Sequence, residues 1–144
     1  WPYRDGEIAR IAAAFDDALP GSADLGAIEY LERLLTAFDH EPPRIWAAPP
    51  GIDGGWLDLG PWERDAWSRR IDDLRDVVDR IAADEATAAD RRTIYTHACC
   101  ATYGDPAYSG NRDGGGWAGI GFPEPMFPPA RTPAKSSNPE GSPR

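Results

Sequence analysis

The sequence predicts a mostly α-helical protein with a small four-helix core, long irregular loops rich in Trp, Gly and Pro, and an extended C-terminal tail. Three observations lead to this fold class. Apolar residues recur at helical spacing in the segments expected to form the core. The fifteen Gly and fifteen Pro of this 144-residue chain gather between and after those segments. Turn-forming residues fill much of 103–123, which excludes a core helix or a regular strand there.

The first two expected helices cover residues 5–19 and 24–39. Asp5 is placed to cap the first helix, and either Ser22 or Asp24 to cap the second. Apolar side chains three and four residues apart give each helix one face for core packing. These positions are Ile8, Ile11, Phe15 and Leu19, and then Leu25, Ile28, Leu31, Leu35 and Phe38.

An irregular block at residues 41–61 follows, with paired prolines, paired glycines and the tryptophans Trp46 and Trp56. So long a stretch without an element is uncommon in a compact domain, so we expect it to be functional or braced by a partner. Pro61 suits the first position of a third helix. That helix carries one narrow apolar seam, formed by Trp67, Ile71, Leu74, Val78 and Ile81.

A fourth helix is expected over about residues 88–102. Thr87 and Asp90 have the spacing of a capping box, with Asp in place of the usual Glu. We divide the chain into a helical domain, 1–123, and a Pro-rich tail, 124–144, which cannot form a core and is expected to be extended.

The formal net charge of −9 argues against binding to nucleic-acid phosphates and against a polybasic membrane contact. No apolar run approaches the ~20 residues that a membrane span needs. No secretion signal is visible, and because the chain begins at Trp1 we expect a processed N-terminus.

The loop from Tyr103 to Pro123 is the most informative part of the chain. It combines turn formers with the aromatic residues Tyr108, Trp117 and Phe122. These are too many aromatic residues to leave in water, so they pack on the chain's own helices or on a partner.

This loop resembles the C-terminal signature of the gluconate 2-dehydrogenase subunit 3 family. The chain departs from that signature at Ser109, where the family usually has Gly, and in the three glycines before Trp117. A weaker likeness covers the helical half around residues 19–31. The matching positions of the loop are Asp105, Pro106, Tyr108, Gly110, Asn111, Asp113, Trp117, Gly121, Phe122 and Pro123.

The resemblance implies a non-catalytic small subunit with no catalytic group, cofactor or metal of its own. Its partner would be a large FAD-dependent subunit of the glucose–methanol–choline type that oxidises a sugar, sugar acid or polyol. A cytochrome c subunit or a quinone would accept the electrons. The complex would be periplasmic or otherwise extracytoplasmic and membrane-associated, and this chain would stabilise the partner, chaperone it or help its export.

The expected interface with that partner combines the irregular block and the signature loop. The residues assigned to it are Trp46, Trp56, Tyr103, Asp105, Pro106, Tyr108, Asn111, Arg112, Asp113, Trp117, Phe122 and Pro123. The rival function is a free-standing secreted helical module whose aromatic loop binds a carbohydrate directly.

Two motifs in the loop suggest other ligands. Residues 114–119 satisfy GxGxxG, but a dinucleotide site needs a βαβ unit around it, so any flavin belongs to the partner. Ser109, Asn111 and Asp113 have the spacing that opens an EF-hand, but Ile120 stands where a bidentate Glu is required. A calcium site stays open, and a turn held by Asn and Asp bonds to backbone N–H groups is favoured.

The cysteines Cys99 and Cys100 follow His97 on the fourth helix. Successive helical side chains point ~100° apart, so the three cannot face one metal ion. Adjacent cysteines also do not bridge each other easily. Either both thiols are free and buried, or one is buried and the other forms a disulfide with another subunit.

Overall fold

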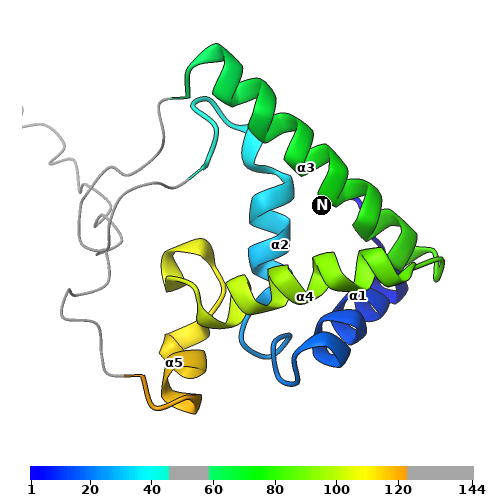
Figure 1. The fold of residues 1–144 in the computed structure, drawn as a ribbon, viewed down its shortest axis with the longest axis vertical. Coiled ribbons are helices and arrows are strands. Elements are labelled where there is room, and N and C mark those ends of the chain that lie inside the picture. The colour runs from blue at the N-terminus through cyan, green and yellow to red at the C-terminus, as the bar shows by residue number, and fades with distance from the viewer. Residues whose placement is uncertain (46–58, 123–144) are drawn as a thin grey trace, which may run out of the picture.

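The computed structural model describes residues 1–45 and 59–122, and this part is mostly α-helical, as predicted, with no strand (Figure 1). The predictions at Trp46, Trp56, Pro123 and the tail, 124–144, lie outside the described residues. The helices are α1 (Asp5–Ala18), α2 (Ala27–Leu35), α3 (Pro61–Ala82), α4 (Ala88–Tyr103) and α5 (Gly115–Gly119).

Helices α1 to α4 share one hydrophobic core. Helix α4 crosses α1 and α2, and α3 packs on the same two helices from another side (Figure 1). The apolar stripes predicted from sequence supply most of the core side chains, with α4 adding small residues that let it approach closely. The buried set includes Ile11, Phe15, Leu31, Leu35, Ile71, Leu74, Val78, Ile81, Ile94, Ala98 and Ala101.

Helix α3 begins at Pro61, as its sequence predicts. Gly60 is the N-cap, and its backbone N–H donates to the Glu63 carboxylate at 3.0 Å. Proline is favoured at this position because its missing N–H would have no helical partner there. The seam that follows is buried except at Trp67, which is half-buried.

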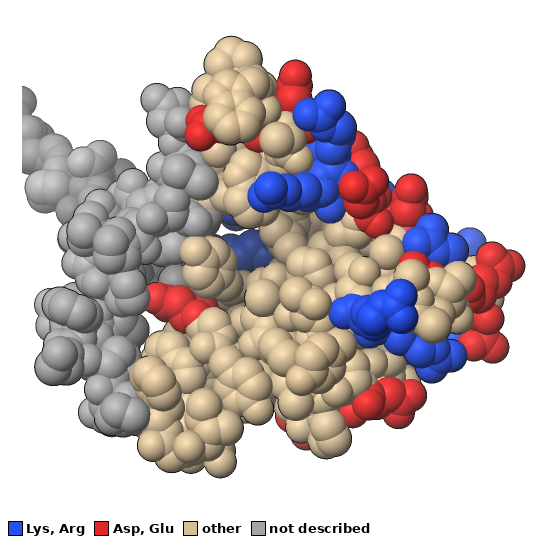
Figure 2. Space-filling view, in the orientation of Figure 1, with Lys and Arg blue, Asp and Glu red and all other residues tan. Residues whose placement is uncertain are grey.

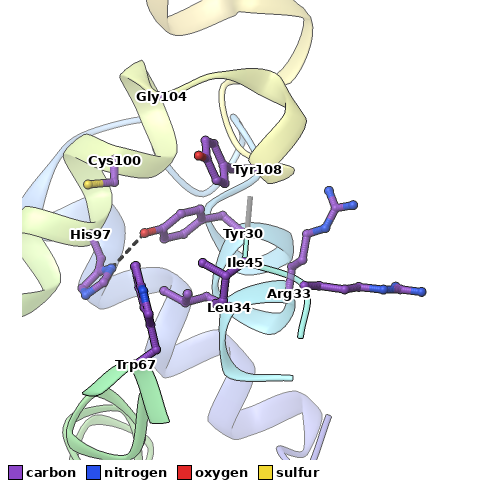
Figure 3. A pocket seen from close by; sticks show the side chains of 10 residues that line it. Tyr30, Arg33, Leu34, Ile45, Trp67, His97, Cys100, Gly104 and Tyr108 are labelled. Atoms are coloured by element: carbon purple, nitrogen blue, oxygen red, sulfur yellow. Dashed lines mark hydrogen bonds between the residues drawn. The ribbon is translucent and has the colours of Figure 1, made fainter. Parts of the chain in front are cut away.

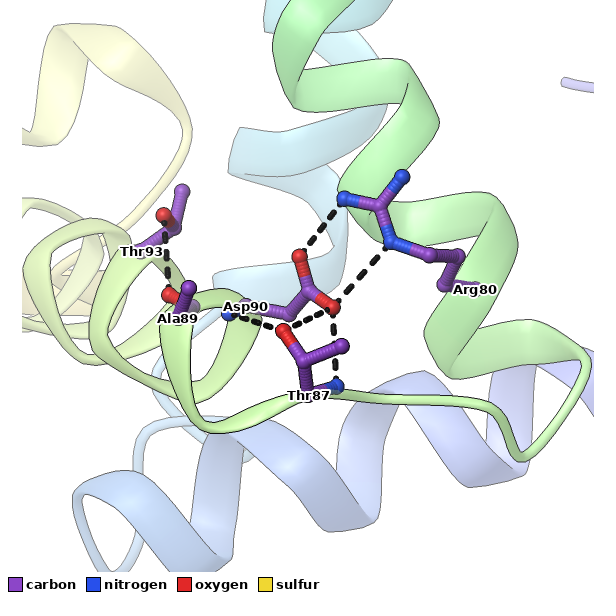
Figure 4. Close-up of polar contacts among 5 residues, drawn as sticks. All are labelled: Arg80, Thr87, Ala89, Asp90 and Thr93. Atoms are coloured by element: carbon purple, nitrogen blue, oxygen red, sulfur yellow. Dashed lines mark hydrogen bonds and ion pairs between the residues drawn. The ribbon is translucent and has the colours of Figure 1, made fainter.

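The turn from α3 to α4 is fixed by a carboxylate with several partners (Figure 4). Thr87 and Asp90 form the predicted capping box, with the Thr87 N–H donating to Asp90 at 2.8 Å. Arg80, near the end of α3, donates to both Asp90 oxygens, at 2.6 and 3.1 Å. The Arg80 and Thr87 donors hold the pKa of the Asp90 carboxyl well below its usual range. This ion pair, in which Asp90 is buried and Arg80 is partly exposed, therefore links the two helices.

Both N-terminal capping predictions are wrong. Arg4, not Asp5, is the N-cap of α1, and its N–H donates to Glu7 at 2.8 Å while Asp5 begins the helix. Helix α2 begins at Ala27 after the N-cap Gly26, so neither Ser22 nor Asp24 caps it.

The physical reason for the late start of α2 is Gly26. Its φ of +95° lies in the left-handed region and ends any helical path from residue 24. A Cβ there would lie 2.7 Å from the Ser109 carbonyl oxygen. The C-terminal loop therefore packs directly on this turn. After Leu35 the chain forms a 3-10 turn at Ala37–Asp39 and does not continue the helix to residue 39.

The glycine run contains a short helix that the sequence did not predict. After 3-10 turns at Pro106–Tyr108 and Arg112–Gly114, residues Gly115–Gly119 form α5, which packs on the end of α4. A glycine-rich segment rarely holds a helix by propensity. Tertiary contacts to α4 therefore stabilise α5.

Candidate functional site

The signature loop is organised around a buried asparagine. Asn111 has no solvent exposure and a left-handed φ of +46°. Its side-chain amide donates to the Gly104 carbonyl at 2.9 Å, and its side-chain oxygen accepts from the Gly116 N–H at 2.9 Å. Asn111 thus ties the end of α4 to α5. It was predicted as an interface residue, but its burial makes it an internal anchor, because both ends of the amide bond the chain's own backbone.

Two glycines let the loop backbone touch the last turn of α4. A Cβ on Gly110 would lie 2.8 Å from the Ala101 Cα. A Cβ on Gly116 would lie 2.8 Å from the Thr102 carbonyl carbon and closer still to its oxygen. Any side chain at these positions would force the loop off the helix.

Arg112 joins the loop to α2. Its guanidinium donates to the Asp24 carbonyl at 3.0 Å and to the Glu29 carboxylate at 2.7 Å, and its backbone N–H donates to the Leu25 carbonyl. The ion pair is half exposed on both sides. The side chain predicted to meet a partner is therefore already engaged within the chain.

Trp117 is held in one position by its own chain. The indole N–H donates to the Tyr103 carbonyl at 2.8 Å, and the ring lies 6.2 Å from that of Phe122. The sequence predicted that this N–H needs an acceptor. The acceptor is the carbonyl of the last residue of α4.

An apolar surface remains at this end of the molecule. We define the α5 surface as Tyr103, Trp117, Ile120 and Phe122, of which Ile120 and Phe122 are more than half exposed. Figure 2 shows few charged side chains around α5, whereas charges crowd the opposite end along α3. A weakly charged, exposed apolar surface is typical of an interaction site.

The remaining predicted loop residues lie around this surface or beside it. Asp105 and Pro106 are half-buried at the turn after α4. Asp113 is exposed with a φ of +55°, on the outside of the loop. Tyr108 is partly exposed and points toward a cavity on the other side of the loop.

That cavity was not predicted from the sequence. We call it the α2–α4 pocket, with a volume of about 390 Å³, bordered by α2, α3, α4 and the loop (Figure 3). The sequence gives little indication of this pocket, because its residues come from five separate segments. Taken individually, each looks like an ordinary helix residue. Among them are Tyr30, Leu34, Ile45, Trp67, His97 and Cys100.

A hydrogen-bonded pair lies in the pocket wall. The Tyr30 hydroxyl and His97 Nδ1 are 3.0 Å apart (Figure 3). Burial, with Cys100 nearby, raises the pKa of the Tyr30 hydroxyl, and burial lowers the pKa of His97. Both groups are therefore neutral near pH 7.

The depressed pKa of His97 predicts a pH effect on stability. The unfolded chain, with His near 6.5, binds a proton more readily than the folded chain does, so stability rises with pH. We expect the free energy of unfolding to be highest above pH 6.5 and to fall as pH drops below it. In urea titrations across this range, His97→Gln should show a weaker pH dependence than the wild type. An identical dependence in the two proteins would contradict this.

Two arginines also line the pocket. The Arg33 guanidinium donates to the Ser109 hydroxyl at 2.7 Å. Burial and the nearby Arg44 both lower the pKa of Arg33. The two cations therefore lie close enough to repel each other.

The two cysteines face different surroundings. Cys100 is exposed and lines the α2–α4 pocket, whereas Cys99 is half-buried beside Tyr95. Both are free within the described residues, and neither is fully buried, so the burial expected in both alternatives, of two thiols or of one, is wrong. A disulfide to another subunit stays a prediction.

The other ligand motifs find no further support in the described residues. Asn111 is the central residue of the EF-hand-like spacing. Both polar atoms of its side chain are hydrogen-bonded to backbone groups, as expected for a turn held by Asn. Across 1–45 and 59–122, no three His, Cys, Asp or Glu side chains group as a metal site would require. No helix in these ranges has the length and hydrophobicity to cross a bilayer.

Comparisons with protein-family models, with curated proteins and with solved structures found no match for this chain.

Proposed function

We propose that this chain is a non-catalytic accessory subunit that binds and stabilises a large FAD-dependent oxidoreductase of the glucose–methanol–choline type. The partner would oxidise a sugar, sugar acid or polyol, carry the FAD and pass electrons to a cytochrome c subunit or a quinone. The proposal rests on the resemblance of the signature loop. The single observation that carries it further is the α5 surface, which remains apolar at the end of a loop fixed by internal bonds.

The anchoring of the loop supports binding over catalysis. Asn111, Arg112 and the indole of Trp117 are all engaged with the chain's own backbone or side chains. These bonds hold Ile120 and Phe122 in place before any partner arrives. Preorganised apolar groups lose little conformational entropy on binding, which favours a stable interface.

The experiment compares two equally exposed aromatic residues. Phe122 belongs to the α5 surface and Tyr95 lies on the middle of α4, and both are 54% exposed. We expect a large FAD-dependent oxidoreductase in a neighbouring reading frame and would co-express it with this chain. Phe122→Ser should weaken co-purification about tenfold, since a buried aromatic contributes roughly 1.5–3 kcal/mol. Tyr95→Ser should leave it unchanged.

Two results would oppose the proposal. If the two variants change co-purification equally, the interface is not centred on the α5 surface. The carbohydrate-binding module would be favoured if the chain is a monomer by light scattering, does not bind the flavoprotein and is retarded on a polysaccharide matrix. In that case Phe122→Ser should abolish the retardation.

A further inference from the structure

We propose that the α2–α4 pocket binds a small carboxylate with an apolar body, the carboxylate lying toward Arg33 and Arg44. This inference goes beyond the accessory function and does not depend on a partner subunit.

The charges in the pocket point to an anion. Arg33 and Arg44 both border the cavity, although the chain as a whole carries a net charge of −9. No Asp or Glu lies among the pocket residues of the described chain, and there Arg44 takes part in none of the ion pairs. The planar guanidinium fork matches a carboxylate, and an anion that reaches both groups would be attracted to two positive charges.

The rest of the pocket points to an apolar body. Leu34, Ile45 and Trp67 form its wall, and Figure 3 places His97 and Trp67 on the side opposite Arg33. The Tyr30 hydroxyl and His97 Nδ1 are engaged with each other. A ligand that extends away from the arginines therefore meets mainly hydrocarbon.

The size of the cavity fits a small molecule. Its volume of about 390 Å³ lies within the range of roughly 300–1,000 Å³ that is usual for ligand sites. The cations lie at one side and the apolar wall at the other. An amphipathic monocarboxylate satisfies both sides at once, whereas a free sugar would place hydroxyl groups against Leu34, Ile45 and Trp67.

The test uses octanoate and phenylbutyrate as probes, with octanol and phenylbutanol as their uncharged counterparts. Calorimetric titration of the full chain should show binding of a carboxylate, and weaker binding of the matching alcohol. Arg44→Gln should weaken the carboxylate about fivefold and leave the alcohol unchanged. Arg64→Gln is the matched control, because Arg64 is paired with Glu41 outside the pocket.

Adjacent cysteines supply a second readout. Cys100 lines the pocket and Cys99 does not. A bound carboxylate should slow the alkylation of Cys100 by iodoacetamide and leave Cys99 unaffected, as peptide mass spectrometry would report. Cys100→Trp should abolish carboxylate binding in the calorimetric titration, because the indole would occupy the cavity.

Three outcomes would overturn the proposal. The first is that neither carboxylate binds, and the second is that the alcohols bind as tightly as the acids. The third is that Arg44→Gln and Arg64→Gln have the same carboxylate affinity. Circular dichroism of each variant separates a lost ligand from a lost fold.

Discussion

Replacing Gly116 with Ala is expected to destabilise the folded chain by about 3 kcal/mol, the upper part of the usual range for overpacking. The added Cβ would meet the Thr102 carbonyl group, which is backbone and cannot rotate away. The α5 helix would have to move off α4 and would break the bond from the Gly116 N–H to Asn111. Urea unfolding followed by far-ultraviolet circular dichroism measures the loss.

Gly119 is the matched control in the same helix. A Cβ on Gly119 would meet nothing within 4 Å. Ala is a better helix former than Gly by up to about 1 kcal/mol, so Gly119→Ala should be neutral or slightly stabilising. The same substitution three residues apart is therefore expected to act in opposite directions. If both variants unfold at the same urea concentration, the close approach of α5 to α4 is wrong.

Hydrogen exchange distinguishes a local effect from a global one. If α5 leaves α4 without unfolding the core, amides near residues 111–119 should lose protection in Gly116→Ala while those of α1 keep theirs. The summed tryptophan emission of the chain should then shift to longer wavelength, because Trp117 would lose its packing. Such a result would still support the contact, because Gly119→Ala should show neither change.

Replacing Asn111 with Gly is expected to cost about 2–3 kcal/mol. The variant keeps the left-handed backbone but loses the bonds to Gly104 and Gly116, and each buried group left unsatisfied costs about 1–3 kcal/mol. Asn111→Ala should cost about 1 kcal/mol more than Asn111→Gly, because a Cβ disfavours positive φ. Thermal and urea unfolding of the two variants separate the side-chain bonds from the backbone term.

Asp84 is the control for this comparison. It also has a positive φ, +64°, but it lies exposed in the turn after α3. Asp84→Gly removes backbone strain without removing buried hydrogen bonds, so it should be neutral or stabilising. A loss as large as that of Asn111→Gly would mean that the greater backbone freedom of glycine in the unfolded chain, not the lost amide bonds, determines the effect at both sites.

The α5 surface and the α2–α4 pocket lie on different sides of the signature loop, and each has its own variants. Phe122→Ser tests the first and Arg44→Gln the second. Since Phe122 does not line the pocket and Arg44 does not belong to the α5 surface, one proposal can fail without the other. The loop residues between them, Asn111 above all, should affect both sites when replaced.

The sequence by itself determined the features that depend on neighbours a few residues away. The seam of α3, the proline at its first position and the capping box at Thr87 are local patterns of period and hydrogen bonding, and they appear where predicted. The need of the Trp117 indole for an acceptor also followed from its chemistry.

Only the tertiary structure decided the start of α2, the existence of α5, the burial of Asn111 and the presence of the pocket. Gly26 ends the helical path before Ala27 at a turn that contacts Ser109, which is 83 positions later in the chain. Gly116 lies in a helix whose backbone packs closely against Thr102 and whose N–H donates to Asn111. Close contacts between segments so far apart in the chain produce no periodic pattern in the sequence. In the sequence of a turn-rich loop, a glycine or asparagine that contacts another backbone segment cannot be distinguished from one that faces solvent. Those contacts decide which residues anchor the loop and which remain exposed.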